Sequence, residues 1–342
     1  MGIHQARKKA CSTKKCTTEI LEWFESLLRD RDAISQKQRE GWVFFLLHHV
    51  FLCFVDDINA ISIEKWAEEI EELRPPTKSI QQLSKILSSY EFVLKEHSEQ
   101  SIGPDILGVL FENVLGFLEQ KETNVRHNTG SFYTPPPIVN YMIEESLILY
   151  LEHKIAMTGD MKEKLHQLLR CHTPLSKKNP FEEEPDLTKE IVQVLSTCKI
   201  LDPCCGAGAF PIGVLEKMVD VLDILDPQNI LWKEIHVQKK YIQKHPDRIE
   251  VVDSIFDDNK VSPRFTKKLF LIQNCIFGVD IQPLATQICA WRCFISLVSE
   301  IKRDIPKQKN KARTLPQRST NYDKDNRKLI QIMIKYLYYK KR

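Results

Sequence analysis

Residues 201–210 read Leu-Asp-Pro-Cys-Cys-Gly-Ala-Gly-Ala-Phe and combine one acid with two glycines. The apolar residues before Asp202 predict a short buried strand, and the residues from Phe210 onward predict a helix. A glycine turn between a strand and a helix lets the backbone approach a ligand. A carboxylate at Asp202 repels pyrophosphate and attracts an ammonium group, so the segment favours a nucleoside that carries an amino acid. The alternative is an ordinary strand-to-helix turn with an incidental acid.

A second acid, Asp280, follows a predicted buried strand over residues 276–279 and precedes a predicted helix that begins at Leu284. In nucleotide-binding sheets, an acid in this place accepts hydrogen bonds from the ribose hydroxyls. Asp280 lies 78 residues after Asp202, whereas the usual interval is about 20 residues. We therefore expect the chain to leave the sheet over residues 226–274 and to return. An acid that complements the start of a helix is the alternative role.

A third segment, residues 130–139, reads Gly-Ser-Phe-Tyr-Thr-Pro-Pro-Pro-Ile-Val. Thr134 is a predicted N-cap, and proline suits the first helical turn because its missing N–H is not needed there. The apolar spacing that follows predicts a helix over residues 138–151. Taken alone, this segment indicates a capped helix and no chemistry.

Taken in chain order, with residues 130–139 first, residues 201–210 second and the segment around Asp280 third, the three segments resemble those of S-adenosylmethionine-dependent adenine-N6 DNA methyltransferases. The resemblance is strongest to the single-chain enzymes of type IIG restriction–modification systems and related phage-defence methylases, and it covers about residues 102–300. It implies S-adenosylmethionine as the cofactor and double-stranded DNA as the partner of the full-length family. The fold implied is α/β, an incomplete Rossmann-like methyltransferase sheet with an α-helical N-terminal domain. The cofactor-binding residues implied are Phe132, Tyr133, Thr134, Pro135, Asp202, Pro203, Gly206, Gly208, Phe210, Asp280 and Ile281.

In this family, the Phe-Tyr-Thr-Pro segment and the Asp-Pro-x-x-Gly-x-Gly loop contact the methionine end of the cofactor. The acid after the second strand binds the ribose. This chain has Cys204 and Cys205 where the family more often has Ala-Cys, and Ala207 where it has Ser or Thr. These changes are small and compatible with cofactor binding.

The catalytic tetrapeptide of the family, Asn-Pro-Pro followed by Tyr or Phe, is absent from the sequence. In the family, its Asn side chain and a proline carbonyl accept hydrogen bonds from the adenine amino group. Its aromatic ring stacks on the base after the base has left the duplex. The nearest match, Asn179-Pro180-Phe181, lacks one proline, and its charged flanks predict a polar surface loop. We therefore assign no catalytic residue and expect this chain alone to be inactive.

Residues 302–342 contain 14 Lys and Arg and 3 Asp, a net charge of +11, whereas the whole chain carries +3. Their residue types are those of A/T-rich codons, which indicates a frameshift or truncation and a tail that is non-native or disordered. A second polypeptide that carries the missing catalytic half is then an expected partner. The alternative is a basic arm that contacts DNA.

The remaining organisation is predicted from spacing and composition. We expect a disordered basic start over residues 1–16, a helical N-terminal domain over 17–125 and the cofactor-binding half of a methyltransferase over 126–301. Residues 160–190, which mix charges with prolines, predict a surface insertion. Because two strands leave an apolar sheet uncovered, we expect residues 199–300 to be molten or poorly soluble.

Several other classes of site and location are not supported. The ten cysteines form no Cys-x-x-Cys pair, which predicts no metal site and suits a reducing cytoplasm. The most apolar run, residues 43–55, is shorter than the roughly 20 residues that cross a bilayer, so we expect a cytoplasmic protein without a membrane segment. A nuclease motif is also not evident, because Asp247 and Glu250 lack the lysine that would complete it.

Three functions are compatible with these observations. The first is a DNA adenine-N6 methyltransferase of a restriction–modification system. The second is a non-catalytic fragment that binds cofactor or assembles with another polypeptide. The third is a methyltransferase that acts on a protein or an RNA.

Overall fold

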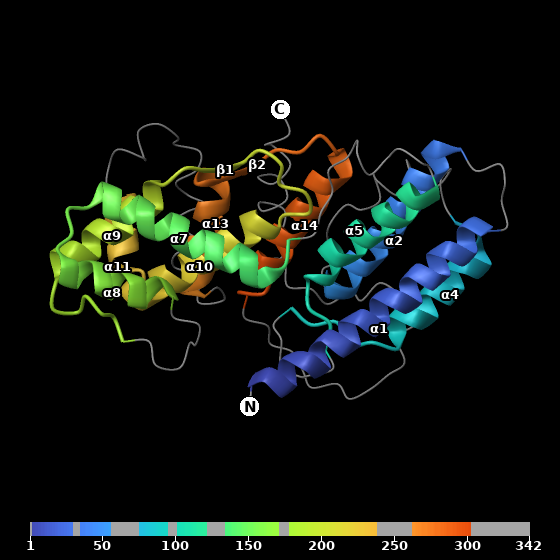
Figure 1. Ribbon diagram of the computed structural model, residues 1–342, viewed down its shortest axis with the longest axis horizontal. Coiled ribbons are helices and arrows are strands. Elements are labelled where there is room, and N and C mark those ends of the chain that lie inside the picture. The colour runs from blue at the N-terminus through green and yellow to red at the C-terminus, as the bar shows by residue number, and fades with distance from the viewer. Residues whose placement is uncertain are drawn as a thin grey trace. The chain divides into compact units, whose positions relative to one another are not determined.

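The computed structural model describes residues 2–29, 35–55, 75–94, 101–121, 134–170, 178–237 and 262–301. The chain divides into two compact units (Figure 1). Of the described residues, those up to 121 and Gln282–Ile295 belong to the first unit. Thr134–Ile281 and residues 296–301 belong to the second. Residues 282–295 therefore do not group with the predicted methyltransferase part.

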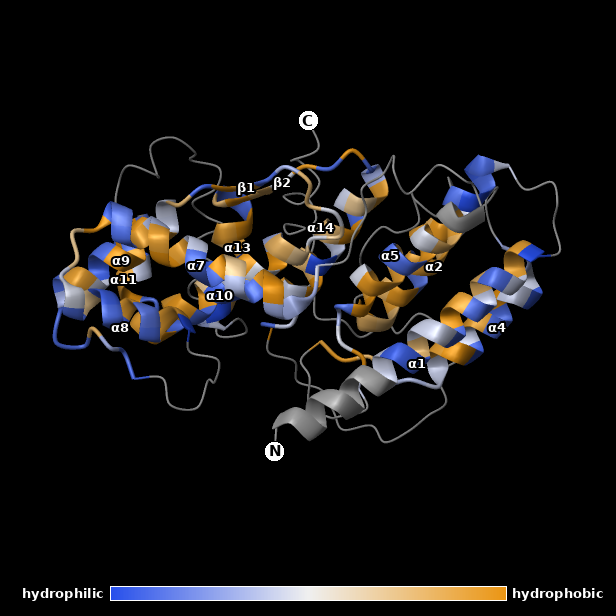
Figure 2. Ribbon diagram, viewed as in Figure 1, coloured by the Kyte–Doolittle hydropathy of each residue, from blue (hydrophilic) through white to orange (hydrophobic). Residues whose placement is uncertain are grey.

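The described part of the first unit is helical. In Figure 2, α2 and α5 are coloured mostly hydrophobic, whereas hydrophilic and hydrophobic residues are mixed along α4 and the coloured part of α1. Helix α1 packs against α4 and α5, and α2 packs against α5. The Trp23 indole N–H, on α1, donates to the Ser79 carbonyl, on α4, at 2.8 Å. The helices are α1 (Gly2–Arg29), α2 (Gln36–Val55), α4 (Thr77–Ser88), α5 (Ile106–Lys121) and the first part of α14 (Pro283–Val298).

Helix α1 corrects the expectation of a disordered start over residues 1–16, because it begins at Gly2. Eight of the fifteen residues from Gly2 to Cys16 are Ala, Lys, Arg or Gln, which are good helix formers, and none is proline, so the stretch has a helical preference. Its continuation is packed, with Cys16, Ile20 and Phe24 fully buried. A helix propagates readily from a packed segment that has already paid for nucleation.

The first part of α14 joins the first unit through an aromatic contact. Phe51 of α2 stacks on Trp291 with 5.1 Å between ring centroids, and Phe294 lies 6.0 Å from Phe51. Arg292 pairs with Asp105 at 2.6 Å. The helix after Asp280 groups with the N-terminal helices because these rings bury one another. The spacing of apolar residues in the sequence does not indicate which helices will make such contacts.

The second unit builds its core around α10, which contacts α7, α8, α9 and α13. Fully buried core residues come from several of these helices and from the short helix α11, among them Leu151, Ile191, Leu215, Leu222 and Trp232. The elements are α7 (Pro136–Lys154), α8 (Gly159–Arg170), α9 (Pro185–Thr197), β1 (Ile200–Asp202), α10 (Ala209–Leu225), α11 (Ile230–Val237), α13 (Pro263–Asn274) and β2 (Ile276–Gly278).

The two strands form a parallel sheet in which Ile200 pairs with Ile276, Leu201 with Phe277 and Asp202 with Gly278. Ile276 is buried among the core residues and Ile200 packs against them. The opposite face carries Leu201 and Phe277, which are 63% and 36% exposed. Parallel sheets are ordinarily covered on both faces. Here the described core residues cover one face, whereas on the other face Leu201 is mostly exposed and Phe277 is partly exposed.

The described parts of the predicted surface insertion, residues 160–170 and 178–190, pack into the core instead. Leu165 and Leu169 of α8 are fully buried, and so is Phe181 in the turn before α9. The Asn179 side chain accepts a hydrogen bond from the Phe181 amide at 2.9 Å, which shapes that turn. The charges that suggested a solvent-exposed loop occupy the outer face of amphipathic elements, while their apolar residues enter the core.

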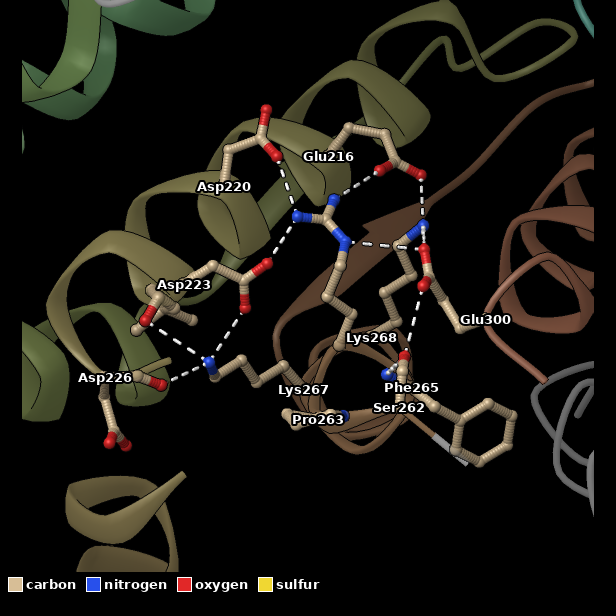
Figure 3. A network of polar contacts seen from close by, with 12 residues as sticks. Glu216, Asp220, Asp223, Asp226, Ser262, Pro263, Phe265, Lys267, Lys268 and Glu300 are labelled. Atoms are coloured by element: carbon tan, nitrogen blue, oxygen red, sulfur yellow. Dashed lines mark hydrogen bonds and ion pairs between the residues drawn. The ribbon is translucent and has the colours of Figure 1, made fainter. Parts of the chain in front are cut away.

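A polar network joins α10 to α13 (Figure 3). Arg264 forms ion pairs with Asp220 at 2.9 Å and with Asp223. Lys267 is completely buried, and its ammonium donates to Asp223 at 2.9 Å and to the Asp226 carbonyl at 2.6 Å. Lys268 pairs with Glu216 and with Glu300, at 2.8 and 3.0 Å. The helix that follows the glycine loop is thereby tied to the helix that leads into β2.

The same network shifts the pKa values of its bases. Burial lowers the pKa of Lys267, although Asp223 acts in the opposite direction. Burial also acts to lower the pKa of Arg264, but Asp223, Asp220 and Glu300 together raise it. Removal of one charge from this network would leave its partner buried without a counter-charge, which destabilises the fold.

Candidate functional site

The candidate site begins where β1 ends at Asp202 and the chain turns into α10. Gly206 and Gly208 have φ values of 51° and 87°, in the left-handed region. Residues with a Cβ adopt this region only under strain, whereas glycine does so freely. Gly208 is the N-cap of α10. The two glycines therefore permit the tight turn that the sequence predicts between strand and helix.

Backbone hydrogen bonds extend the strand pairing into this loop. The Val279 amide donates to the Asp202 carbonyl at 2.9 Å, and the Cys205 amide donates to the Val279 carbonyl at 2.9 Å. The Gly208 amide then donates to the Cys205 carbonyl at 2.8 Å. The loop is thus anchored to the residues that follow β2, at the same end of the sheet.

Each of the two acids accepts a hydrogen bond from a loop amide. Oδ1 of Asp202 accepts from the Cys204 amide at 3.1 Å. Oδ2 of Asp280 accepts from the Gly206 amide at 2.9 Å, across a sequence separation of 74 residues. The expectation that Asp202 and Asp280 follow adjacent strands at one end of the sheet is confirmed.

The close approach of the glycine loop to the end of β2 depends on a third glycine, which the sequence pattern did not single out. A Cβ at Gly278, the last residue of β2, would lie 3.0 Å from Sγ and 3.1 Å from Cβ of Cys205. Cys205 is buried in this contact, whereas its neighbour Cys204 is exposed. A glycine that ends a strand beside a second strand is the signal that marks this contact in the sequence.

The other predicted residues of this loop differ in exposure. Pro203 is exposed and Phe210 is half-buried at the first turn of α10. Ile281, directly after the second acid, is 81% exposed. An exposed isoleucine beside a carboxylate offers an apolar surface next to a polar one, which suits a ligand that has both kinds of surface.

The third predicted segment is only partly described. Phe132 and Tyr133 lie outside the described residues, whereas Thr134 and Pro135 precede α7. Thr134 is not the N-cap; Pro135 is, and its carbonyl accepts from the Ile138 amide at 2.9 Å. With three successive prolines fixing the backbone, the helix begins two residues earlier than predicted and needs no side-chain cap.

A fourth glycine, also missed in the sequence, brings α7 toward the glycine loop. A Cβ at Gly213, in the second turn of α10, would lie 2.7 Å from Cδ1 of Ile143 and 3.1 Å from Cγ1 of Val139. The first half of α7 therefore packs directly on the first turns of α10. A glycine inside a helix, where it lowers stability, is the sequence signal for such a close approach.

The described residues give no support for a metal centre or a membrane segment. Within the described ranges, no three His, Cys, Asp or Glu side chains are grouped as metal ligands. None of the described helices combines the length and the apolar character needed to cross a membrane. Asp247, Glu250 and the basic tail over residues 302–342 lie outside the described residues.

Comparison with known proteins gives one relative. The chain is similar to a protein of Methanocaldococcus jannaschii whose assigned name is type II restriction enzyme and methyltransferase. The two are 23% identical over 219 residues, which are 63% of this chain and 16% of the relative. The chain thus spans a small part of that protein's length. No protein-family model and no solved structure matches the chain. The similarity supports a relationship to methyltransferases of restriction–modification systems.

Proposed function

We propose that the protein is a methyltransferase of a restriction–modification system that binds S-adenosylmethionine at the Asp202–Asp280 site and acts on adenine N6 in DNA. The observation that carries the proposal is the position of two carboxylates at one end of adjacent parallel strands, with a glycine loop between them. In α/β sheets, ligands bind outside the carboxyl ends of the strands. The similarity to a restriction enzyme and methyltransferase agrees with this assignment.

The residues present fit the cofactor chemically. Asp202, at the mouth of the loop, is the acceptor for the ammonium group of the methionine moiety. Asp280 is the acceptor for the ribose hydroxyls, and Ile281, 81% exposed, offers an apolar face to the adenine ring. When bound, S-adenosylmethionine supplies an electrophilic methyl group on a sulfonium. The part played by these residues is to bind and orient that group.

One sequence observation favours a second candidate. The sequence lacks the Asn-Pro-Pro-Tyr or Asn-Pro-Pro-Phe tetrapeptide that would hold the adenine amino group. A fragment that binds cofactor and leaves transfer to another polypeptide is therefore the second candidate function. Binding and transfer are measured separately to distinguish the two.

The test is calorimetric titration of the purified chain with S-adenosylmethionine and, as a competing class of ligand, NAD⁺. We expect S-adenosylmethionine to bind and NAD⁺ not to bind. Asp202→Ala is expected to lose affinity by about tenfold or more, the equivalent of one charge-assisted hydrogen bond. Asp160→Ala, which removes an exposed acid at the start of α8, is the matched control and keeps the affinity.

Transfer is then followed with tritiated cofactor on unmethylated duplex DNA, on RNA and on protein. N6-methyladenine in the DNA supports the first candidate, and binding without transfer supports the second. Absence of S-adenosylmethionine binding, or unchanged binding by Asp202→Ala, overturns the assignment of the site.

A further inference from the structure

The carboxylate of Asp280 does more than face a ligand, because it already contacts the loop. Its Oδ2 accepts the hydrogen bond from the Gly206 amide at 2.9 Å. Gly206 has a φ of 51°, and Gly208, two residues later, has a φ of 87°. Both glycines adopt the left-handed backbone conformation that residues with a Cβ rarely adopt.

We propose that Asp280 is a positioning residue that holds the glycine loop in its binding conformation before a ligand arrives. The ligand that the loop binds rests on the proposed function, but the loop's order does not. Glycine loses more conformational freedom on folding than any other residue, so a loop with two glycines needs specific bonds to stay ordered.

The bond from the Gly206 amide to Asp280 differs from the other hydrogen bonds of the loop. The Cys205 and Gly208 amides donate to backbone carbonyls, and the Cys204 amide donates to Asp202 of the same strand. The Gly206 amide donates to a side chain that belongs to the residues after the other strand. The Cys205 amide already links the loop to Val279 through the backbone. The Gly206 bond adds a second link, at the centre of the loop, to the residues after β2, and its acceptor is a charged side chain. Charge-assisted bonds are the stronger class.

The arrangement has a consequence for ligand binding. A carboxylate has about four acceptor positions, so the hydroxyls of a nucleoside share Asp280 with the Gly206 amide. A loop that is ordered in advance does not lose that freedom when the ligand binds, which raises affinity. Asp280 thereby contributes twice, once to the loop and once to the ligand.

Amide hydrogen exchange measures the loop directly and needs no cofactor. The chain has 11 glycines, so selective ¹⁵N-glycine labelling leaves few signals, and substitution at Gly206 and Gly208 assigns the two of interest. The variants are Asp280→Ala, which removes the acceptor, and Asp280→Asn, which keeps a side-chain oxygen in place. Asp202→Ala is the matched control, because its carboxylate bonds to Cys204 and not to a glycine.

We expect exchange of both the Gly206 and Gly208 amides to accelerate by roughly ten- to a hundredfold in Asp280→Ala. Asp280→Asn and Asp202→Ala are expected to stay within a few-fold of the unchanged protein. Acceleration at Gly206 alone overturns the proposal, because the loop is then ordered without this bond. Equal acceleration in Asp202→Ala also overturns it.

If Asp280→Ala does not fold, the unchanged protein still decides the matter. A Gly206 amide that exchanges at the rate of an unstructured peptide overturns the proposal. A Gly206 amide that is protected from exchange to the same degree as the amides of α10 supports it. A separate titration with S-adenosylmethionine tests the proposed function, so failure of one claim is distinguishable from failure of the other.

Discussion

Nζ of Lys217 lies 2.6 Å from Oε1 of Glu144 where α10 packs on α7, and the two side chains are only 13% and 7% exposed. Lys217 also donates to the Leu169 carbonyl at 3.0 Å. The next residue of α7, Glu145, pairs with Arg170 at the same 2.6 Å, but there the side chains are 32% and 49% exposed. Two adjacent glutamates thus make ion pairs of equal length in different surroundings.

Glu144→Ala is expected to lower the free energy of unfolding by about 3 kcal/mol, because it leaves the Lys217 ammonium buried without its partner. Glu145→Ala is the matched control and is expected to lower it by less than about 1 kcal/mol, because water screens the exposed pair. Urea denaturation of both variants measures the difference. Equal losses would contradict the assignment of a buried pair.

Two buried histidines are expected to make the protein less stable in mild acid. Burial lowers the pKa of His236 to about 4, and burial together with His49 lowers that of His48 to about 4. Their ordinary pKa is 6.5, so between pH 6.5 and 4 the unfolded chain binds protons that the folded protein does not. The free energy of unfolding is therefore expected to fall as pH falls through this window, by up to about 3 kcal/mol for each group.

His236→Phe tests the second unit's share of this effect. His236 packs on Phe270 and Trp232, with ring centroids 4.0 and 4.5 Å away, so a phenyl ring keeps the contact and removes the titration. The variant is expected to flatten the pH dependence of urea denaturation between pH 6.5 and 4. His153→Ala, which removes an exposed histidine, is the control variant. An unchanged slope in His236→Phe would show that this ring is not buried in its neutral form.

The buried ammonium of Lys267 is expected to make stability depend on pH in the alkaline range. Burial lowers its pKa below the ordinary 10.5, so between these two values the unfolded chain binds more protons than the folded one. Relative to Lys267→Met, the unchanged protein is expected to gain stability as pH rises through that window. At pH 7 the variant is expected to lose about 2 kcal/mol, because the Leu222 and Asp226 carbonyls and the Asp223 carboxylate lose their donor. Urea denaturation at pH 7, 8.5 and 10 measures both, and a difference that does not change with pH contradicts the prediction.

Gly213→Ala is expected to lower the free energy of unfolding by about 1 kcal/mol. Alanine is ordinarily the better helix former, but here its methyl group would lie 2.7 Å from Cδ1 of Ile143, and overpacking costs about 1–3 kcal/mol. The double variant Gly213→Ala/Ile143→Val removes that methyl group and is expected to recover most of the loss. Gly159→Ala, at a position with nothing within 4 Å, is the control and is expected to be neutral or stabilising.

Local patterns in the sequence predict the strand, loop and helix around Asp202. The strand ends at this acid and the helix begins after Gly208, one residue before the predicted Phe210. The strand before Asp280 is likewise predicted to within one residue. Such elements are readable because short apolar runs, glycine turns and helical spacing act within a window of a few residues.

Tertiary packing decides the rest. The register of Ile200 with Ile276 and the bond from Gly206 to Asp280 join residues more than 70 positions apart, and they depend on how α10 and α13 pack between the strands. Phe181 is buried although its neighbours are charged, and α14 divides between two units because Trp291 packs on Phe51. Sequence alone therefore determined which residues end the strands. Only the folded chain determined that they meet, because long-range contacts are set by the shapes that helices bury against one another.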